Sequence, residues 1–544
     1  MLLHSYSSLY NPVIASIPCY GYGIMISMRR YLYIAVFFSG MASLAVEFSA
    51  SRLLGNYFGS SNLVWASIVG LILIYLTAGY FLGGHWADRS PHYSTLFKIL
   101  CWAGLTTGLV PVVSRPVLRM AANAFDQLQL GVLFGSFTVV MILFVIPVTL
   151  MGTASPFAIR LAIEDPSAAG KVSGRIYAIS TLGSFIGTFL PVLVLIPNVG
   201  TYRTFLIISF ILILVALIGL VMAQGIRKSV PYFGMPILIV LLAIFGIPGT
   251  DKNSIGQVYE KESAYNYIQV LDQDGYMLLR LNEGQGVHSI YKPGQYNFNG
   301  PWERVLTAPF FNDSPYPRSE VENIAILGLA AGTTAVESAR VFPNVTIDGY
   351  EIDPEIVKVG YQYFGMDLPN LNVVIQDARW GLAHSTQQYD VISVDAYRPP
   401  YIPWQMTTVE FFQMVREHLK PNGVMVINVG TAPSDRRLLA SLYKTIGEVF
   451  PSLYVSDVAG SFNSVIYATN QKTSIQGLME NYQVLNADPS TPDFLLQILA
   501  ETYAGMQPAP TGGVIFTDDK APIEQLTNSM VLNFLLSGQV EKLQ

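Results

Sequence analysis

The sequence predicts a multi-pass α-helical membrane region followed by a soluble α/β domain, with a small antiparallel β-sheet between them. Three observations carry this prediction. Only 12% of the 544 residues are charged, whereas ordinary globular proteins have roughly 25%. The deficit lies in the first 250 residues, which hold 13 Lys and Arg and 5 Asp and Glu, a net charge of +8, while the remainder has a net charge of −14. From about residue 321, short apolar runs alternate with helical stretches, as in a doubly wound α/β sheet.

The apolar half divides into seven segments long enough to cross a bilayer, which takes about 20 residues for a hydrocarbon core of ~30 Å. They run roughly over residues 31–50, 62–83, 95–114, 130–151, 176–197, 203–223 and 232–248. We therefore expect the lipid bilayer as a partner. The predicted divisions are an N-terminal tail over 1–30, a membrane domain over 31–250, a β-sheet subdomain over 251–320 and an α/β domain over 321–544. Met28, which is followed by Arg29 and Arg30, offers an alternative biological start, so the first 27 residues carry little weight in this prediction.

Basic residues near the spans indicate orientation, because cytoplasmic loops are enriched in Lys and Arg. The tail and the loops after the second, fourth and sixth spans carry Arg29, Arg30, Arg89, Arg160, Lys171, Arg175, Arg227 and Lys228; the opposite loops carry Arg52, Arg115, Arg119 and Arg203. We expect the first set in the cytoplasm. Seven full crossings would then put the soluble half outside. A cytoplasmic soluble half, which we expect, requires that the seventh span does not cross or that the N-terminal stretch adds an eighth.

Two charged residues, Glu47 and Arg52, lie in or near the first span. Ionisable residues at membrane depth are often functional, but a structural ion pair with neighbouring helices is the favoured interpretation here. The soluble half is acidic, which argues against nucleic acid as a partner. With only Cys19 and Cys101 in the chain, neither a disulfide framework nor a thiolate metal site can be built, and we expect no metal.

The soluble half begins with a pattern typical of a small antiparallel sheet. Over residues 258–310, apolar and polar residues alternate between the turn signals QDG and NEG, and this sheet should cap a neighbouring site. Later apolar runs near 452–457 and 463–469 would complete an α/β sheet of about seven strands.

Ligands of doubly wound sheets bind at the carboxyl ends of the strands, where this sequence places a glycine loop and several acids. Gly328 and Gly332 let the backbone turn tightly and approach a ligand. Glu351 follows the second strand, 23 residues after Gly328, a spacing at which an acid can accept both ribose hydroxyls. Asp377 and the amide of Ala378 can hold adenine. Asp395 ends the fourth strand, and four such strand ends together predict a binding site.

The motifs GLAAGTT, GYEID, IQDAR, YDVISVDAY, TTVEFF and LKPNGV resemble the spermidine synthase group of aminopropyltransferases, over roughly 258–470. Together with FSGMASLAVEF, GGHWADR, GRIYAISTLGSFIGTF and FTDDKAPIE, the chain is similar to bacterial proteins in which a transporter-like membrane region is fused to a spermidine synthase domain. The resemblance implies a Rossmann-like fold of the seven-strand methyltransferase type, located at the inner membrane. It also implies that S-adenosylmethionine or its decarboxylated form binds as co-substrate at Glu351, Asp377 and Ala378, and that Asp395 takes the proton of an acceptor amine.

The sequence departs from this family on the amine side of the site. Ala331 stands where the glycine loop usually carries an Asp, and Arg398 where a second acid usually follows the first. His288 replaces a Gln of the capping sheet, and a Tyr and a His are replaced around Pro301 and Thr307. A guanidinium would repel a polyamine unless Glu303, Glu410 or another acid offsets its charge. By this resemblance His288, Glu303 and Arg398 are the candidate substrate-binding residues.

Three functions remain open from the sequence. The first is a membrane-anchored aminopropyltransferase that acts on a small-molecule amine such as putrescine. The second is an S-adenosylmethionine-dependent transferase with a different acceptor, favoured by Ala331 and Arg398. The third is a transporter or sensor whose soluble domain binds a nucleoside without reacting, favoured by the fusion itself. A homo-oligomer is compatible with each of them.

Overall fold

The computed structural model describes residues 19–58, 62–128, 132–246, 252, 254–282, 286–397, 401–431 and 435–536. The helical half contains α1 (Cys19–Phe58), α2 (Asn62–Arg89), α3 (Tyr93–Leu128), α4 (Val132–Gly152), α5 (Ala154–Ala162), η1 (Pro166–Ala168), α6 (Ala169–Phe189), η2 (Leu190–Leu195), α7 (Ile196–Val199), α8 (Thr201–Gln224), α9 (Ile226–Ser229), η3 (Val230–Phe233) and α10 (Gly234–Phe245).

Within these residues, seven helical stretches are long and apolar enough to cross a membrane, which confirms the predicted multi-pass helical region. They cover Ser27–Tyr57, Val64–Arg89, Tyr93–Leu118, Phe137–Ala162, Pro166–Val199, Thr201–Gln224 and Ile226–Phe245. All seven are longer than the sequence predicted, because hydropathy marks the segment in hydrocarbon and the helix continues beyond it. The first, at 31 residues, is about 46 Å long at 1.5 Å per residue.

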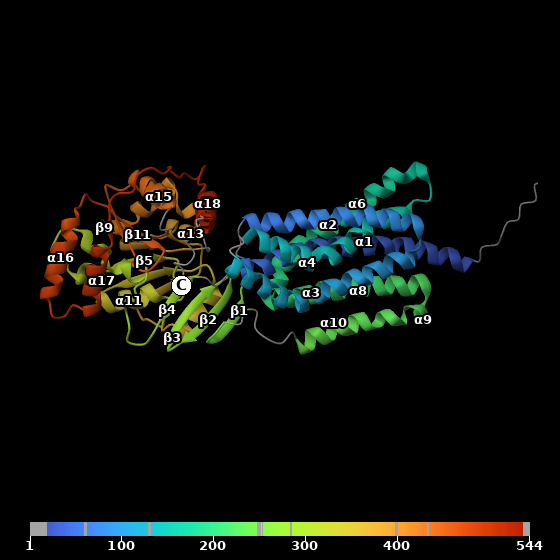
Figure 1. The fold of residues 1–544 in the computed structure, drawn as a ribbon, viewed down its shortest axis with the longest axis horizontal. Helices are drawn as coiled ribbons and strands as arrows, with labels where there is room; N and C mark the ends of the chain where they lie inside the picture. Colours follow the sequence, from blue (N-terminus) through green and yellow to red (C-terminus); the bar gives the residue numbers. More distant parts are fainter. Residues whose placement is uncertain are drawn as a thin grey trace, which may run out of the picture.

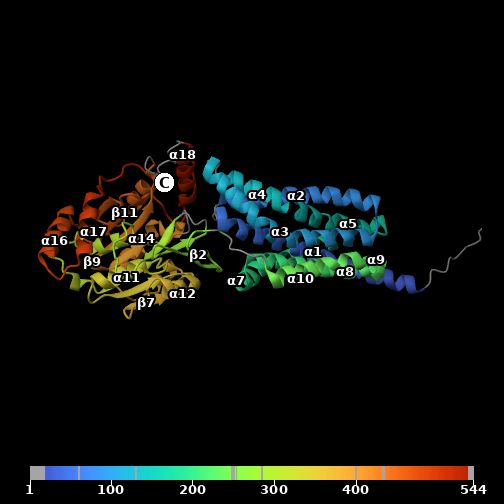
Figure 2. The ribbon, with the colours of Figure 1, turned by 60° about the horizontal axis from the view of Figure 1, so that its bottom comes forward.

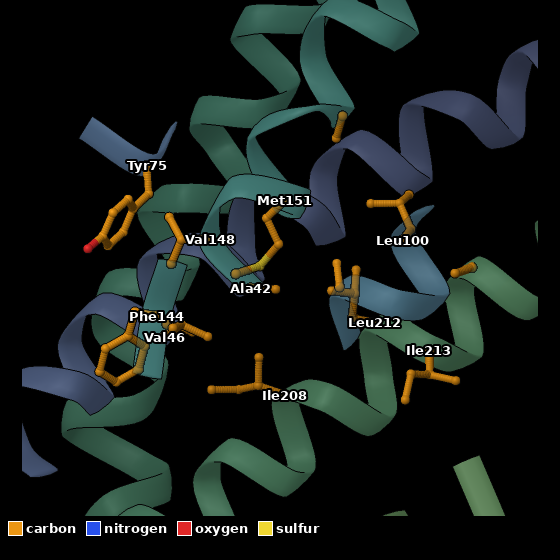
Figure 3. Close-up of a cluster of buried hydrophobic side chains, with 14 of the residues drawn as sticks. Ala42, Val46, Tyr75, Leu100, Phe144, Val148, Met151, Ile208, Leu212 and Ile213 are labelled. Carbon is orange, nitrogen blue, oxygen red and sulfur yellow. The ribbon is translucent and has the colours of Figure 1, made fainter. Parts of the chain in front are cut away.

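The helical bundle is held together by an apolar interior shared among α1, α2, α3, α4 and α8. Figure 3 shows side chains from several helices that face this interior and are fully or almost fully buried, namely Val46, Phe144, Val148, Ile208 and Leu212. Close packing rather than a hydrophobic driving force joins helices within lipid. The bundle therefore offers a fixed support for whatever is attached to its ends.

The two ends of the bundle differ in what they contact. Arg29 of α1 pairs with Glu164, just after α5, at 3.1 Å, and Asp88 at the end of α2 pairs with Arg160 of α5 at 3.0 Å. These contacts lie at one end of the bundle. At the other end, the last turns of α1 and the start of α8 contact the soluble half through Glu262. Figures 1 and 2 show the bundle and the soluble half end to end, with α9 far from the strands.

This arrangement bears on the predicted topology. The loops after the second, fourth and sixth spans lie at the end away from the soluble half, so seven crossing helices put those loops and the soluble half on opposite sides of a bilayer. If seven helices cross, these loops and the soluble half cannot all face the cytoplasm. The number of predicted spans led to the same conclusion.

A four-stranded antiparallel sheet follows the bundle, in the order β1 (Gln257–Glu262), β2 (Tyr267–Gln273), β3 (Tyr276–Leu281) and β4 (Val287–Tyr291). Its QDG turn contains Asp274 and Gly275 at positive φ, as a tight hairpin turn requires. The sheet was expected to extend to residue 310, but it ends at Tyr291, and η4 (Glu303–Phe311) is a buried 3₁₀-helix. Pro301 and Pro309 lack the amide hydrogens that a strand ladder needs, which explains this difference.

The α/β domain is built on a mixed sheet in the order β12-β10-β11-β9-β8-β5-β6-β7. The seven predicted strands are present, and the pair β12 with β10 adds an eighth of only two residues. The strands are β5 (Asn323–Leu327), β6 (Thr346–Tyr350), β7 (Leu371–Val374), β8 (Tyr389–Val394), β9 (Leu419–Gly430), β10 (Ser452–Asp457), β11 (Asn463–Thr469) and β12 (Met506–Gln507).

Helices cover both faces of this sheet. Along β5, Ala325 and Leu327 face one apolar cluster, and Ile324 and Ile326 face the other, which is the alternation expected of a strand buried on both sides. The connecting elements are η5 (Arg318–Glu320), α11 (Thr333–Val341), α12 (Pro354–Tyr363), α13 (Ala378–Ala383), η6 (Trp404–Met406), α14 (Val409–Glu417), α15 (Arg437–Gly447), α16 (Ile475–Ala487), α17 (Asp493–Ala504) and α18 (Ile523–Leu536).

Candidate functional site

Three strand ends form the floor of the candidate site. Leu327 of β5 pairs with Tyr350 of β6 and with Val394 of β8. The next residue of each strand is therefore at the same level of the sheet, and these residues are Gly328, Glu351 and Asp395. Since neighbouring strands lie about 4.8 Å apart, the glycine loop is flanked on one side by Glu351 and on the other by Asp395.

The glycine loop needs its two glycines for conformation and for space. Gly328 has φ +99° and Gly332 has φ +92°, both in the region that residues with a Cβ avoid. A Cβ at Gly328 would lie 2.6 Å from the Asp395 carbonyl oxygen, and one at Gly332 would lie 2.6 Å from Met366 Cγ. Gly328 therefore brings the loop directly against the backbone of Asp395.

Glu351 is held by the loop that it faces. Its Oε2 accepts a hydrogen bond from Ala330 N at 3.0 Å, and its Oε1 accepts one from Asp353 N at 3.0 Å. Burial raises the pKa of Glu351 to about 7, opposed by these backbone hydrogen bonds. Because each carboxylate oxygen has two lone pairs, both oxygens retain capacity to accept a ribose hydroxyl.

Asp377 and Ala378 lie where β7 leads into α13. Asp377 Oδ1 accepts a hydrogen bond from Trp380 N at 2.9 Å and so caps this helix. Ala378 is the first residue of α13, where backbone amides have no acceptor within the helix. The cap occupies only one carboxylate oxygen, so the pair can still offer an acceptor and a donor to an adenine edge.

Asp395 is half-buried and is oriented by a neighbouring strand. Asn428 Nδ2 of β9 donates to Asp395 Oδ1 at 3.0 Å. Burial raises the pKa of Asp395 to about 7, against the lowering effect of this hydrogen bond. A carboxyl group with a pKa near neutrality is suited to accept and release a proton at physiological pH.

The small sheet packs on the glycine loop through β4, so it does lie beside the site. Ala331 N donates to Ser289 Oγ at 2.9 Å, and Thr333 Oγ1 both accepts from Ile290 N and donates to Ile290 O. His288 precedes this contact. Its Nε2 is buried without a partner among the described residues, and burial lowers its pKa to about 4. At neutral pH the imidazole is therefore uncharged and does not repel a cationic substrate.

Glu303 is enclosed in its own turn. Its Oε1 accepts hydrogen bonds from Phe298 N at 3.0 Å and from Gly300 N at 2.8 Å. Burial raises its pKa, and the nearby Glu337 has a pKa raised by burial and by Glu303. Glu303 Oε2 and both oxygens of Glu337 have no partner within the described part of the chain. Glu303 is fully buried and thus has one oxygen that is hydrogen-bonded and one that has no partner among the described residues.

Arg398 lies outside the described residues, so the structure does not test its predicted place beside a substrate.

The structure adds two residues that the sequence analysis missed. Asn428 orients Asp395, and Tyr397 OH donates to Asn428 O at 3.0 Å. Two features of the sequence could have indicated them: Asn428 is the one polar residue in the apolar run GVMVINV, and Tyr397 follows Asp395 by two residues.

The C-terminal FTDDKAPIE segment also contributes to this edge of the sheet. Arg379, which follows Ala378, binds Asp518 through two hydrogen bonds of 2.8 and 2.6 Å, and Thr408 Oγ1 donates to the same carboxylate at 2.7 Å. A paired guanidinium and carboxylate fix geometry as well as contributing energy. The segment thereby anchors the start of α13, which contains Ala378.

Residues 314–472 match the family described as the Spermine/spermidine synthase domain, a range that includes β5 to β11 and the three strand ends. The chain carries a spermine/spermidine synthase domain.

Curated relatives match parts of the chain. It is 32% identical over 283 residues to the probable polyamine aminopropyl transferase of Bifidobacterium longum, covering 49% of this chain and 61% of that relative. It is 24% identical over 430 residues to polyamine aminopropyltransferase 2 of Aquifex aeolicus, covering 77% and 83%. The second match is longer than the soluble half, so it includes membrane residues. The chain is also 29% identical over 178 residues to the human eEF1A lysine and N-terminal methyltransferase, covering 30% and 25%.

The chain thus spans about three fifths of the Bifidobacterium relative's length. The synthase domain and its similarity to proteins named aminopropyltransferases are established, while the activity of the whole protein is a matter for proposal.

Proposed function

We propose that the protein is a membrane-anchored transferase that moves an aminopropyl group from decarboxylated S-adenosylmethionine to a diamine such as putrescine. The observation that carries the proposal is the placement of Asp395 at the level of Glu351, on the other side of the glycine loop. This arrangement offers one carboxylate to a nucleoside and a second to an incoming amine. The spermine/spermidine synthase domain supports the same chemistry.

In this proposal, Glu351 accepts the two ribose hydroxyls, and Asp377 with Ala378 N binds the adenine edge. The residues fit such a group, because Glu351 keeps lone pairs free and the Ala378 amide has no acceptor within its helix. Gly328 and Gly332 leave room for the ligand to approach the backbone. The co-substrate supplies a sulfonium, whose adjacent carbon is open to attack.

The transfer is an in-line displacement. The lone pair of the acceptor amine forms a bond to the carbon beside the sulfonium, and the electrons of the breaking carbon–sulfur bond remain on sulfur as a neutral thioether. The attacking nitrogen then loses a proton, which Asp395 accepts. No acid is needed for the leaving group, so catalysis here consists of holding an unprotonated amine in line and removing its proton.

Product analysis by mass spectrometry tests this proposal. Purified full-length protein is incubated with decarboxylated or ordinary S-adenosylmethionine and a panel of amines. We expect 5′-methylthioadenosine and an aminopropylated amine from the decarboxylated form. Binding without turnover of either form would contradict the proposal and favour a nucleoside-binding sensor.

A transferase that uses ordinary S-adenosylmethionine and another acceptor is the second candidate. It is favoured by Ala331, which leaves the glycine loop without the acid that would bind a cationic aminopropyl tail. The similarity to a methyltransferase points the same way. If Arg398 lines the pocket, its charge would pair with the carboxylate of the ordinary cofactor. Arg398→Asp should then shift preference toward the decarboxylated form; an unchanged preference for the decarboxylated form in both proteins would contradict this second candidate.

We further propose that the soluble domain faces the cytoplasm, because the nucleoside co-substrate is made there. The multi-pass bundle would anchor the domain to the inner membrane. No metal takes part in this mechanism.

A further inference from the structure

One carboxylate of the soluble half joins it to two membrane helices. Glu262, at the end of β1, accepts a hydrogen bond from Arg52 Nε of α1 at 3.0 Å. The same carboxylate accepts from Thr201 N at 2.9 Å and from Thr201 Oγ1 at 2.5 Å, at the start of α8. Arg52 was expected to pair with neighbouring helices, and its partner is instead on the small sheet.

The rest of the Arg52 guanidinium holds the turn after β1. Nη2 donates to Ser263 O at 2.5 Å, and Nη1 donates to Tyr265 O at 3.1 Å. The Arg52 and Glu262 side chains are only 21% and 11% exposed, so solvent screens this contact less than a surface ion pair. A planar guanidinium can bind a carboxylate and two carbonyl groups at once, and this fixes the turn against α1.

The same turn binds Asp353, which lies two residues after Glu351. Ser263 Oγ donates to Asp353 Oδ2 at 2.5 Å, and Asn266 Nδ2 donates to the same oxygen at 3.0 Å. Asp353 is fully buried and its backbone N donates to Glu351 Oε1 at 3.0 Å. A continuous series of hydrogen bonds thus runs from a membrane helix to Glu351.

A second contact strengthens this attachment. Lys261 pairs with Glu355 at 2.6 Å, and Glu355 N donates to Asp353 Oδ1 at 3.0 Å at the start of α12. The end of β1 and the turn after it are therefore joined to the start of α12 at two positions, Asp353 and Glu355. A shift of β1 relative to the bundle would have to move Asp353, or break these bonds.

We propose that Arg52 is a positioning residue for the nucleoside site, through which the membrane bundle sets the affinity of the soluble domain for an adenosyl ligand. Arg52 acts through the turn 263–266, Asp353 and Glu351. Because α1 and α8 both bind Glu262, a displacement of one helix against the other would loosen this support. The inference rests on the proposed function only in taking Glu351 as the ribose-binding residue.

Calorimetric titration of the full-length protein in lipid nanodiscs with 5′-methylthioadenosine tests the inference. This probe carries the adenine and ribose common to both co-substrates. We expect Arg52→Gln to weaken binding by about 3- to 30-fold, the range found for residues that couple distant sites. Arg52→Lys keeps the charge opposite Glu262 but cannot bind all three acceptors, so its loss should be smaller. Arg160→Gln, which breaks an ion pair at the other end of the bundle, should bind as the unaltered protein does.

Steady-state kinetics separate positioning from general damage. For Arg52→Gln we expect the KM for the co-substrate to rise while kcat at saturation stays close to that of the unaltered protein. Ser263→Ala removes the bond to Asp353 without touching the bundle and should show the same split, which keeps the inference testable if Arg52→Gln folds poorly. Unaltered affinity in either variant, or a fall in kcat with KM unchanged, would overturn it. Absence of any binding by the unaltered protein would overturn the proposed function itself, and this inference with it.

Discussion

Glu351 and Asp395 occupy equivalent positions after two strands, yet they contact different parts of the protein. Glu351 is bonded to the backbone amides of Ala330 and Asp353, whereas Asp395 is bonded to the side chain of Asn428. Backbone amides thus hold both carboxylate oxygens of Glu351. Asp395 Oδ1 is held by a side-chain amide.

Replacement of Glu351 by Gln should weaken co-substrate binding without unfolding the protein. The variant keeps the shape of the side chain but loses the charge that would accept two ribose hydroxyls, and charge-assisted hydrogen bonds contribute about 1.5–3 kcal/mol. We expect affinity to fall about 10- to 150-fold, measured by calorimetry. Unchanged affinity would refute the ribose assignment.

Replacement of Asp395 by Asn should separate binding from chemistry. Asn cannot take the amine's proton, so kcat should fall by about 10²-fold or more, the usual scale for a positioned base. Co-substrate affinity should stay the same, because no nucleoside contact is removed. Loss of binding in this variant would instead place Asp395 in the nucleoside site or in the fold.

The pH dependence of kcat/KM should report these two carboxyl groups. Burial raises the pKa of both Glu351 and Asp395 to about 7, and each must be ionised to act, Glu351 as an acceptor and Asp395 as a base. Activity should therefore be maximal above pH 7 and decline as the pH falls through about 7. A plateau extending down to pH 5 would show that neither group titrates in this range.

Strand-end acids could be predicted from the sequence because each ends an apolar run next to a turn. Asn428 could not, because its side chain reaches Asp395 only through the register of β8 with β9, in which Val394 pairs with Ile427. Register across parallel strands depends on packing of the whole sheet, and no local pattern specifies it. For Arg398, the local pattern gives its place in the sequence after Asp395, but it does not show which groups surround the side chain.

At the scale of elements, the glycine loop and β8 are in direct contact, and their spacing determines where Asp395 lies. Gly328→Ala would place a methyl group 2.6 Å from the Asp395 carbonyl oxygen at a positive φ. We expect a loss of about 1–3 kcal/mol in the free energy of unfolding and reduced kcat, because β8 would have to move.

Denaturant unfolding and steady-state kinetics measure the two effects. Gly447→Ala is a matched control, since its Cβ would make only an ordinary contact, 3.5 Å from Leu453 Cδ1, and its φ is not positive. If Gly328→Ala were as stable and active as this control, the loop would not be the support that we infer.

The strands β10 and β11 were predicted at the bounds they have in the structure, because both are short runs between clear turn signals. The segment 303–311 was wrongly predicted to belong to the small sheet, because Pro301 before it and Pro309 within it cannot donate to a strand ladder. The two-residue β12 carries no pattern of its own; it follows α17 and pairs with β10. Elements were thus predictable where local periodicity decided them.

At the scale of the whole molecule, a membrane bundle and a synthase domain meet through few, specific polar contacts. The sequence showed that Arg52 lies near a membrane boundary, but it could not show that Glu262, 210 residues later, is its partner. That pairing depends on the relative placement of two parts with separate cores. If the pairing of Arg52 with Glu262 positions Glu351, attachment to the membrane and affinity for the co-substrate are coupled in one protein.

Topology can be tested by reporter fusions after residues 90, 170 and 255. The structure puts the first two positions at the end of the bundle away from the soluble half, so for seven crossing helices they should report one side and position 255 the other. A nucleoside co-substrate requires 255 to be cytoplasmic, although eight basic residues against four favour the opposite orientation. We expect the requirement for co-substrate to prevail, with 255 inside and 90 and 170 outside. An external signal at 255 with internal signals at 90 and 170 would confirm seven crossings, but it would exclude a cytosolic aminopropyl donor. Signals from the same side at all three positions would show that the helix Ile226–Phe245 does not cross the membrane.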